Sequence, residues 1–185
     1  MALVIDHPAQ DAVSRWVEDA VIGENLCPFA QREWLAHRVR LCVSDAGDLD
    51  TVLSDLMDEL NRIDQSDTLE TTLVILGEGG GDFDEYLDWL EASNLLVFKM
   101  GLEGKFQLAS FHPEYQFEGE AFEDASNFTN RAPWPVLHIL REESVEAALA
   151  SVDDPDAIFE RNQAHARALG TAYWQSLLAR SHGTS

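Results

Sequence analysis

The chain has few basic residues. It contains 12 Lys and Arg but 34 Asp and Glu, so its formal net charge is −22 over 185 residues. Such an excess of acid repels phosphate backbones and anionic lipid surfaces, and it removes the attraction on which non-specific nucleic-acid binding depends. We therefore expect no nucleic-acid partner and no membrane partner.

Cysteine is also scarce, with only Cys27 and Cys42 in the chain. Two cysteines are too few for a disulfide framework. No apolar run approaches the roughly 18 residues of a membrane-spanning helix, and the first residues lack the basic start of a signal peptide. These absences predict a reduced, cytoplasmic protein.

Apolar residues are present in ordinary amounts: 45% of the chain is hydrophobic and 9% is aromatic, which is enough for a packed core. The length suits a single domain over residues 1–185. Within it we distinguish an N-terminal helical segment with a cysteine loop (1–38), a sheet region (39–143) and C-terminal helices (144–182).

Hydrophobic periodicity locates the elements. Spacings of three and four predict helices, and short runs of branched residues or alternating patterns predict strands. The predicted helices cover about 13–23, 29–36 with Cys27 as its N-cap, 49–63, 83–90, 144–152 capped by Ser144, and a last helix that begins at Asp154 and Pro155 and turns Phe159 inward. The predicted strands cover 39–43, 71–76, 105–112 and 136–141.

This order predicts an α/β fold with a mixed four-stranded sheet whose last strand is antiparallel. Behind an N-terminal helix, the elements follow the thioredoxin-like order β-α-β-α-β-β-α. A ferredoxin-like α+β sandwich is the alternative if a strand is misplaced.

Cys27 is the most suggestive single residue. At a helix N-terminus, free N–H groups and the helix dipole favour thiolate over thiol, as a nucleophile or a metal ligand requires. The alternative is a buried apolar cysteine. Cys42, inside a predicted strand, is expected in the core.

Two histidines lie on predicted strands. His112 ends the third strand just before Pro113, a place where catalytic groups often gather in α/β folds. His138 lies in the middle of the fourth strand, where a hydrogen-bonded interior histidine is the alternative to a functional one.

The segment 114–135 is polar and aperiodic, and so long a loop within one domain points to function. Only three basic residues occur between Cys42 and Asn130, so Arg131 stands in an acidic stretch where it could receive an anion or pair with carboxylates. The candidate binding residues of this loop and of the final strand are Tyr115, Gln116, Asn127, Arg131, His138 and Arg141, with Asn130 as a candidate orienting residue.

Three segments together resemble an uncharacterised bacterial family, the domain of unknown function 1415 family. They are Asn25-Leu26-Cys27-Pro28-Phe29-Ala30, then Ala109-Ser110-Phe111-His112-Pro113 with Tyr115-Gln116-Phe117, then Asn127-Phe128-Thr129-Asn130-Arg131-Ala132-Pro133 with His138 and Leu140-Arg141-Glu142-Glu143-Ser144. In the family pattern a serine tends to stand where this chain has Ala132. The resemblance implies no activity, but it places Cys27 and His112 in signature segments.

Three functions follow as hypotheses. The first is a hydrolase or transferase for a small anionic, acyl, amide or thiol compound, with Cys27 as nucleophile, His112 as base, Asn130 as orienting residue and Arg131 as anion binder. The second is a non-catalytic binding or scaffold domain. The third is a metal site, zinc by preference, on Cys27, His112 and His138. The residues require no cofactor, and they leave the oligomeric state open.

Overall fold

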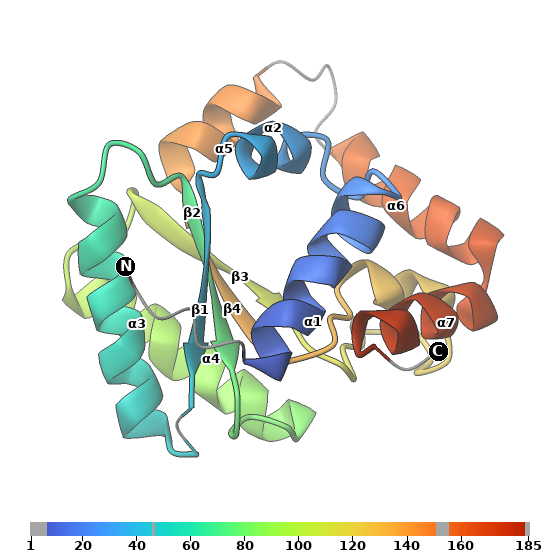
Figure 1. The fold of residues 1–185 in the computed structure, drawn as a ribbon, viewed down its shortest axis with the longest axis horizontal. Coiled ribbons are helices and arrows are strands. Elements are labelled where there is room, and N and C mark those ends of the chain that lie inside the picture. The colour runs from blue at the N-terminus through green and yellow to red at the C-terminus, as the bar shows by residue number, and fades with distance from the viewer. Residues whose placement is uncertain (1–6, 46, 151–155, 184–185) are drawn as a thin grey trace.

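The fold is one mixed four-stranded sheet with helices on both faces (Figure 1); it is given by a computed structural model that describes residues 7–45, 47–150 and 156–183. The strands are β1 (Val39–Ser44), β2 (Thr71–Leu76), β3 (Phe106–Phe111) and β4 (Val136–Arg141). The helical elements are α1 (Pro8–Trp16), the π-helical η1 (Val17–Ile22), α2 (Ala30–Leu35), α3 (Leu49–Asp64), α4 (Phe83–Lys99), the 3-10 helix η2 (Ala125–Thr129), α5 (Glu142–Leu149), α6 (Asp156–Leu169) and α7 (Thr171–Ser181). None of the described helices is both long enough and apolar enough to cross a bilayer.

The strand order across the sheet is β1-β2-β4-β3. β1 and β2 are parallel, and β4 is antiparallel to both of its neighbours. The predicted mixed α/β sheet with an antiparallel last strand is therefore confirmed. The chain does not follow the β-α-β-β-α-β order of the ferredoxin-like alternative. Because β1 lies at an edge, the likeness to thioredoxin is in the order of elements along the chain and does not extend to the strand order across the sheet.

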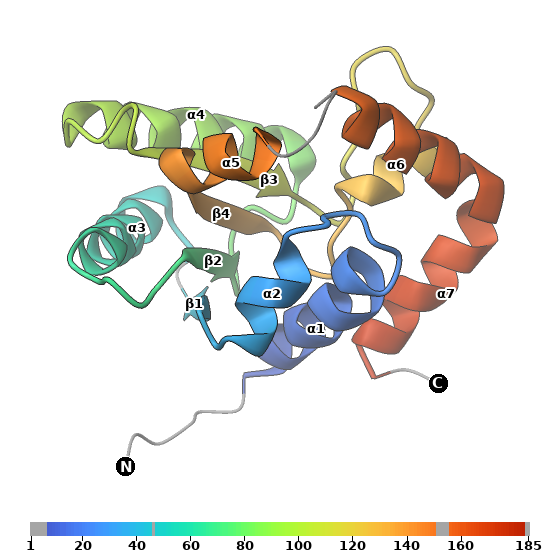
Figure 2. The ribbon, with the colours of Figure 1, turned by 90° about the horizontal axis from the view of Figure 1, so that it is seen from above.

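The two faces of the sheet carry separate apolar cores, and Figure 2 shows the helices divided between them. One core lies between the sheet and α3 with α4, where the stripe Val52, Leu56, Leu60 and Ile63 is buried. The other lies between the sheet and α1, α6, α7 and η2, with Trp16 and Trp174 buried in it. Strand alternation sorts neighbouring residues between the two cores.

Several predicted boundaries are wrong. Cys27 is not an N-cap, because Phe29 occupies that place and the helix is only six residues long. Ser144 lies within α5, which begins two residues earlier. Phe159 is 50% exposed and does not turn into the core. The predicted start at Asp154 and Pro155 lies outside the described residues.

The C-terminal helical stretch also divides in two, because Gly170 takes a φ of 81°, a left-handed conformation that suits glycine and ends α6. The loop 114–135 has a structure of its own: η2 lies within it and packs against α6.

Candidate functional site

A cavity of about 170 Å³ lies beside Cys27. It collects residues from the cysteine loop, the end of β3, η2 and α6. Its lining residues are Val21, Leu26, Cys27, Phe111, Thr129, Asn130, Phe159 and Asn162. The three signature segments therefore meet around one cavity, as a common site requires. We call it the Cys27 pocket.

Cys27 lies in a turn between η1 and α2. Its N–H donates to Val21 O (3.3 Å), and its carbonyl accepts from Ala30 N (3.2 Å). The side chain is half-buried and the thiol is free. The loop geometry, rather than a helix N-terminus, positions the sulfur.

Helix α6 clamps the cysteine loop from across the sequence. Arg161 donates to Asn25 O (2.7 Å), and Asn162 donates to Leu26 O (2.6 Å). Glu24 is hydrogen-bonded to His165 (2.9 Å) and to Tyr173 of α7. Burial raises the pKa of Glu24, but the hydrogen bonds from Tyr173 and His165 outweigh burial and lower it overall. These clamp residues, and Phe159 and Asn162 in the lining, were missed by the sequence analysis.

Asn130 lines the Cys27 pocket, and it also ties β3 to η2. Its amide donates to Ser110 O (3.1 Å), and its backbone carbonyl accepts from His112 N (3.2 Å). Thr129 lies beside it and donates to Ser126 O (2.9 Å). The polar part of the pocket is therefore rigidly held and uncharged.

His112 does not join Cys27. It is fully buried, and its ring contacts Phe83 and Tyr86 of α4, on the face of the sheet opposite the Cys27 pocket. Nδ1 accepts from Glu114 N (3.0 Å), so Nε2 carries the proton and donates to Gly80 O (2.9 Å). Burial lowers the pKa of His112. With both ring nitrogens occupied, His112 holds two loops together and is not placed to act as base for Cys27.

Arg131 is also engaged inside the chain. It is 6% exposed and donates to Tyr115 O (3.0 Å) and Phe122 O (2.8 Å). Its guanidinium lies 4.5 Å from the ring centre of Phe122 and 4.7 Å from that of Phe128. The structure therefore places it at the centre of the 114–135 loop and not at the pocket as an anion binder.

The other candidates from this loop support its shape. Asn127 is fully buried; it accepts from Phe117 N and donates to the carbonyls of Ala121 and Phe122. Tyr115 packs between aromatic rings, and Gln116 donates to Glu120 O (2.7 Å). None of these three lines the Cys27 pocket.

The two candidates on β4 likewise have internal partners. Arg141 donates to the carbonyls of Ile63, Ser66 and Leu69, and so satisfies the carboxyl end of α3. His138 shares a 2.6 Å hydrogen bond with Thr71 Oγ1. Because that hydroxyl gives its proton to the Ile139 carbonyl, His138 Nε2 is the donor.

The alternative metal site is not assembled. In the part of the chain that the structure describes, no three His, Cys, Asp or Glu side chains are grouped so that they could hold an ion. Cys27 lines the pocket, His112 packs against α4, and His138 is hydrogen-bonded to Thr71. Both ring nitrogens of His112 already make hydrogen bonds.

Cys42 provides a contrast within the same chain. It lies on the α3 face of β1, beside Glu59 and Asp55, and is half-buried rather than in the core. Burial, and then Glu59, raise the pKa of its thiol to about 11. Cys42 and Cys27 thus lie on opposite faces of the sheet.

A second hollow of about 300 Å³ lies at the carboxyl ends of β2 and β3. Leu76, Trp134 and Pro135 line it, together with the glycine loop that follows β2. Glu78 is its acidic residue, and no Lys or Arg is among its described lining residues. The hollow therefore lacks the charge that a phosphate would need.

Chemically, the Cys27 pocket is a small chamber with apolar walls, fixed amide and hydroxyl groups, and one nucleophilic atom. In comparisons with curated proteins and with solved structures, nothing matches the chain. A family described as "Protein of unknown function (DUF1415)" matches residues 8–176, nearly the whole chain. Because the match covers most of its residues, the chain belongs to this family, DUF1415.

Proposed function

We propose that this chain binds a small uncharged thiol or disulfide compound in the Cys27 pocket and that Cys27 Sγ exchanges with it. The observation that carries the proposal is the convergence of Cys27, Phe111 and Asn130, each from a different signature segment, on one cavity. A free thiol in a cytoplasmic, reducing setting is part of the proposal.

The pocket favours a small neutral ligand. Its volume of about 170 Å³ is below the roughly 300 Å³ at which drug-sized sites begin. In the described part of the chain, no ionisable side chain other than Cys27 lines it. Arg131 and Arg141 were the expected partners of an anion, but both side chains donate hydrogen bonds to backbone carbonyls.

Thiol exchange suits this site better than acyl or amide hydrolysis, because hydrolysis needs a base and a proton donor beside the sulfur, and His112 is on the other face. In exchange, the Cys27 thiolate attacks one sulfur of a small disulfide. A new S–S bond forms, the old one breaks, and the other half leaves as a thiolate. A second small thiol reverses the step, so no further oxidant is required.

The first test compares the cysteines with bis(2-hydroxyethyl) disulfide, a small uncharged reagent. At pH 8 we expect intact-mass spectrometry to show one adduct, on Cys27. The Cys42→Ser variant should keep the rate and the Cys27→Ser variant should lose at least about tenfold, because the thiolate fraction of Cys42 is very small at that pH. A large dianionic aromatic disulfide should react with Cys27 more slowly in the folded chain than in the unfolded chain. An equal rate of the large reagent with the folded and the unfolded chain would contradict a selective pocket.

The second test uses the pH dependence of Cys42. In the Cys27→Ser variant, alkylation by iodoacetamide should keep rising with pH until about pH 11, since only the thiolate reacts and burial raises the pKa of Cys42 to about 11. Oxidation of the wild-type chain should give no Cys27–Cys42 disulfide, because the sheet separates the two sulfurs. A plateau of the Cys42 rate near pH 8.5, or an intramolecular disulfide, would count against this arrangement.

A further inference from the structure

The outer edge of β1 is unpaired. β1 lies at the end of the sheet and, within the described residues, no other strand pairs with it (Figure 1). The carbonyls of Arg38 and Ser44 point toward β2, since they accept from Glu70 N and Gly77 N (both 2.8 Å). Backbone groups alternate sides along a strand. The N–H and C=O groups of Val39, Leu41 and Val43 therefore face outward.

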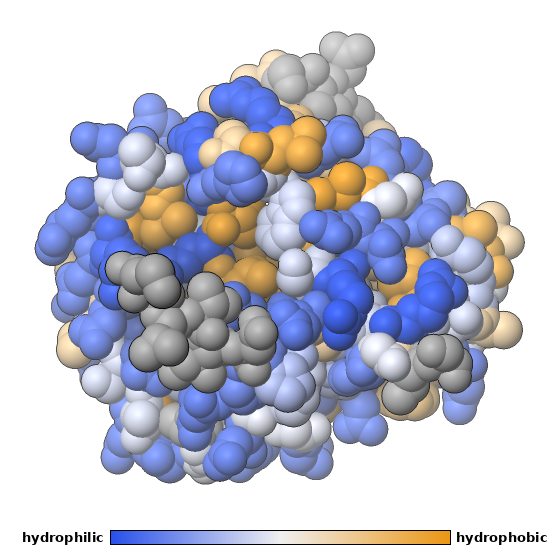
Figure 3. Space-filling model, viewed as in Figure 1, coloured by the Kyte–Doolittle hydropathy of each residue, from blue (hydrophilic) through white to orange (hydrophobic). Residues whose placement is uncertain are grey.

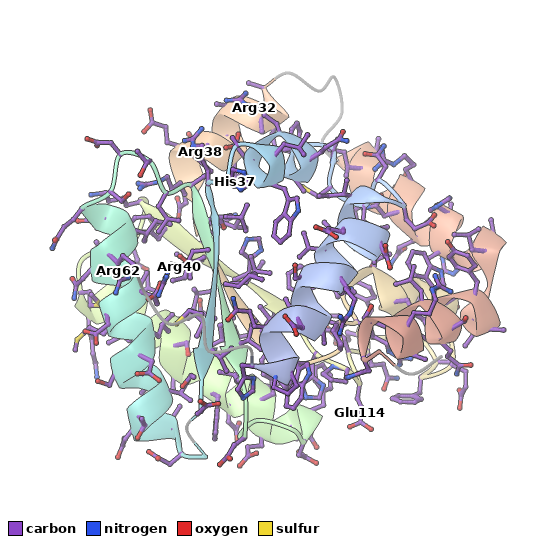
Figure 4. All side chains as sticks on the ribbon, viewed as in Figure 1. Arg32, His37, Arg38, Arg40, Arg62 and Glu114 are labelled. Carbon is purple, nitrogen blue, oxygen red and sulfur yellow. The ribbon has the colours of Figure 1, made fainter. Side chains whose placement is uncertain are left out.

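Arginines gather around this edge. Four of the 12 basic residues of this chain of net charge −22 lie here. They are Arg32 on α2, Arg38 just before β1, Arg40 on β1 and Arg62 on α3. Figure 4 shows Arg38 and Arg40 along β1, Arg62 beside it on α3, and Arg32 with His37 near its amino end. We call these four arginines, with the outward backbone of β1, the arginine edge.

Their partner carboxylates lie deeper than the arginines do. Glu59 is 4% exposed beneath Arg40 and Arg62, which are 38% and 55% exposed. Arg40 and Arg62 each bind Glu59 through Nε, and Arg40 also has a side-chain hydrogen bond with Cys42. The surface thus presents cationic donors while the balancing carboxylate is buried. Such donors suit carboxylates from outside.

The two sides of the edge differ in chemistry. Arg40 turns toward α3, whereas Val39, Leu41 and Val43 are partly buried against the α1 core. Figure 3, in the same view, shows hydrophobic surface among polar residues over the amino-terminal part of β1. In a strand added here, every second side chain would therefore face arginines, and the side chains between them would face aliphatic groups.

We propose that the arginine edge is a docking site for an extended, acid-rich segment of a partner protein, which adds to the sheet as a fifth strand. Its sequence alternates Glu or Asp with Val, Ile or Leu: the acids face Arg40 and Arg62, and the apolar residues face Leu41. A second copy of this chain is a poorer occupant, because pairing of two β1 strands would bring their acidic α3 helices together.

The test uses a fluorescein-labelled hexapeptide that alternates Glu and Val, followed by fluorescence anisotropy with the full chain. We expect saturable binding that weakens as salt rises, and no comparable binding of the Lys-Val peptide. Arg40→Gln and Arg62→Gln should each weaken binding about two- to fivefold. Arg180→Gln, the same change on α7, should leave the affinity unaltered. Equal binding of the Lys-Val peptide, or equal effects of the three variants, would overturn the proposal.

A second test changes the peptide and leaves the protein as wild type, so its outcome does not depend on whether a protein variant folds. Strand addition uses the N–H groups of alternate peptide residues only. Methylating one alternate set should abolish binding, methylating the other should not, and the sensitive set reports whether the added strand is parallel or antiparallel. Tolerance of both sets overturns strand addition. So does sedimentation that shows a peptide-free dimer held by β1, because the occupant is then a second copy.

Discussion

Replacing Arg131 with alanine is expected to lower the free energy of unfolding by roughly 3 to 5 kcal/mol, because a buried group with several partners is removed at once. The change leaves the Tyr115 carbonyl without this donor, and the Phe122 carbonyl keeps only its hydrogen bond from Asn127. It also removes a guanidinium packed between the rings of Phe122 and Phe128, contacts worth about 0.5 to 2 kcal/mol each. The whole 114–135 loop loses its central support.

Chemical denaturation of three variants measures this effect. Arg131→Lys keeps a charge but not the planar fork, so it should fall between wild type and alanine. Arg161→Ala is the matched control: its side chain also donates to a backbone carbonyl, at Asn25, but it is exposed and should cost less than about 1 kcal/mol. If Arg131→Ala unfolded with wild-type stability, the loop would not depend on this residue.

The strands were the most predictable part of the fold. The bounds of β2 and β4 agree with the sequence analysis because branched residues fill both strands and both lie inside the sheet. Alternation along β3 places Phe106 and Leu108 in the α3 core and Phe111 in the other core. Which strand lies at the edge depends on pairing between distant segments, and a local pattern does not encode that.

The candidate site was half predictable. The sequence analysis grouped Cys27 with Asn130 and His112 as one candidate site, but periodicity does not say which face of the sheet a loop covers. Because successive side chains point to opposite faces at the end of β3, His112 and Phe111 lie on opposite faces of the sheet. Phe111 faces Cys27, so His112 cannot.

Helix α6 could not be connected to the site from the sequence. Asn162 and Leu26 are 136 residues apart, and a polar residue on a helix carries no local sign of its partner. The arginines were misjudged for a related reason. Along the sequence, the charged residues near Arg131 are mostly acidic. In the folded chain its hydrogen-bond acceptors are backbone carbonyls, and the composition of a segment does not predict such partners.

The second large effect is expected from pH. Burial lowers the pKa of His138 to about 4, from about 6.5 in the unfolded chain. Between these two pH values the unfolded chain binds a proton that the folded chain does not. The contribution of neutral His138 to the free energy of unfolding is therefore fully present above about pH 6.5 and falls as the pH is lowered. The loss from His138 should reach about 2 kcal/mol by pH 5. Burial lowers the pKa of His112 as well, and the resulting loss has the same sign.

Urea denaturation at pH 7 and pH 5, with wild type and His138→Gln, isolates this contribution. Glutamine keeps a donor for Thr71 Oγ1 but does not titrate, so the variant should lose about 2 kcal/mol less than wild type between the two pH values. The carboxylates whose pKa is lowered in the fold, such as Glu24 and Asp124, weaken stability only at lower pH, below their unfolded pKa values near 4. An identical loss in both chains would show that a proton on His138 is accommodated within the fold and that burial does not hold the ring in its neutral form.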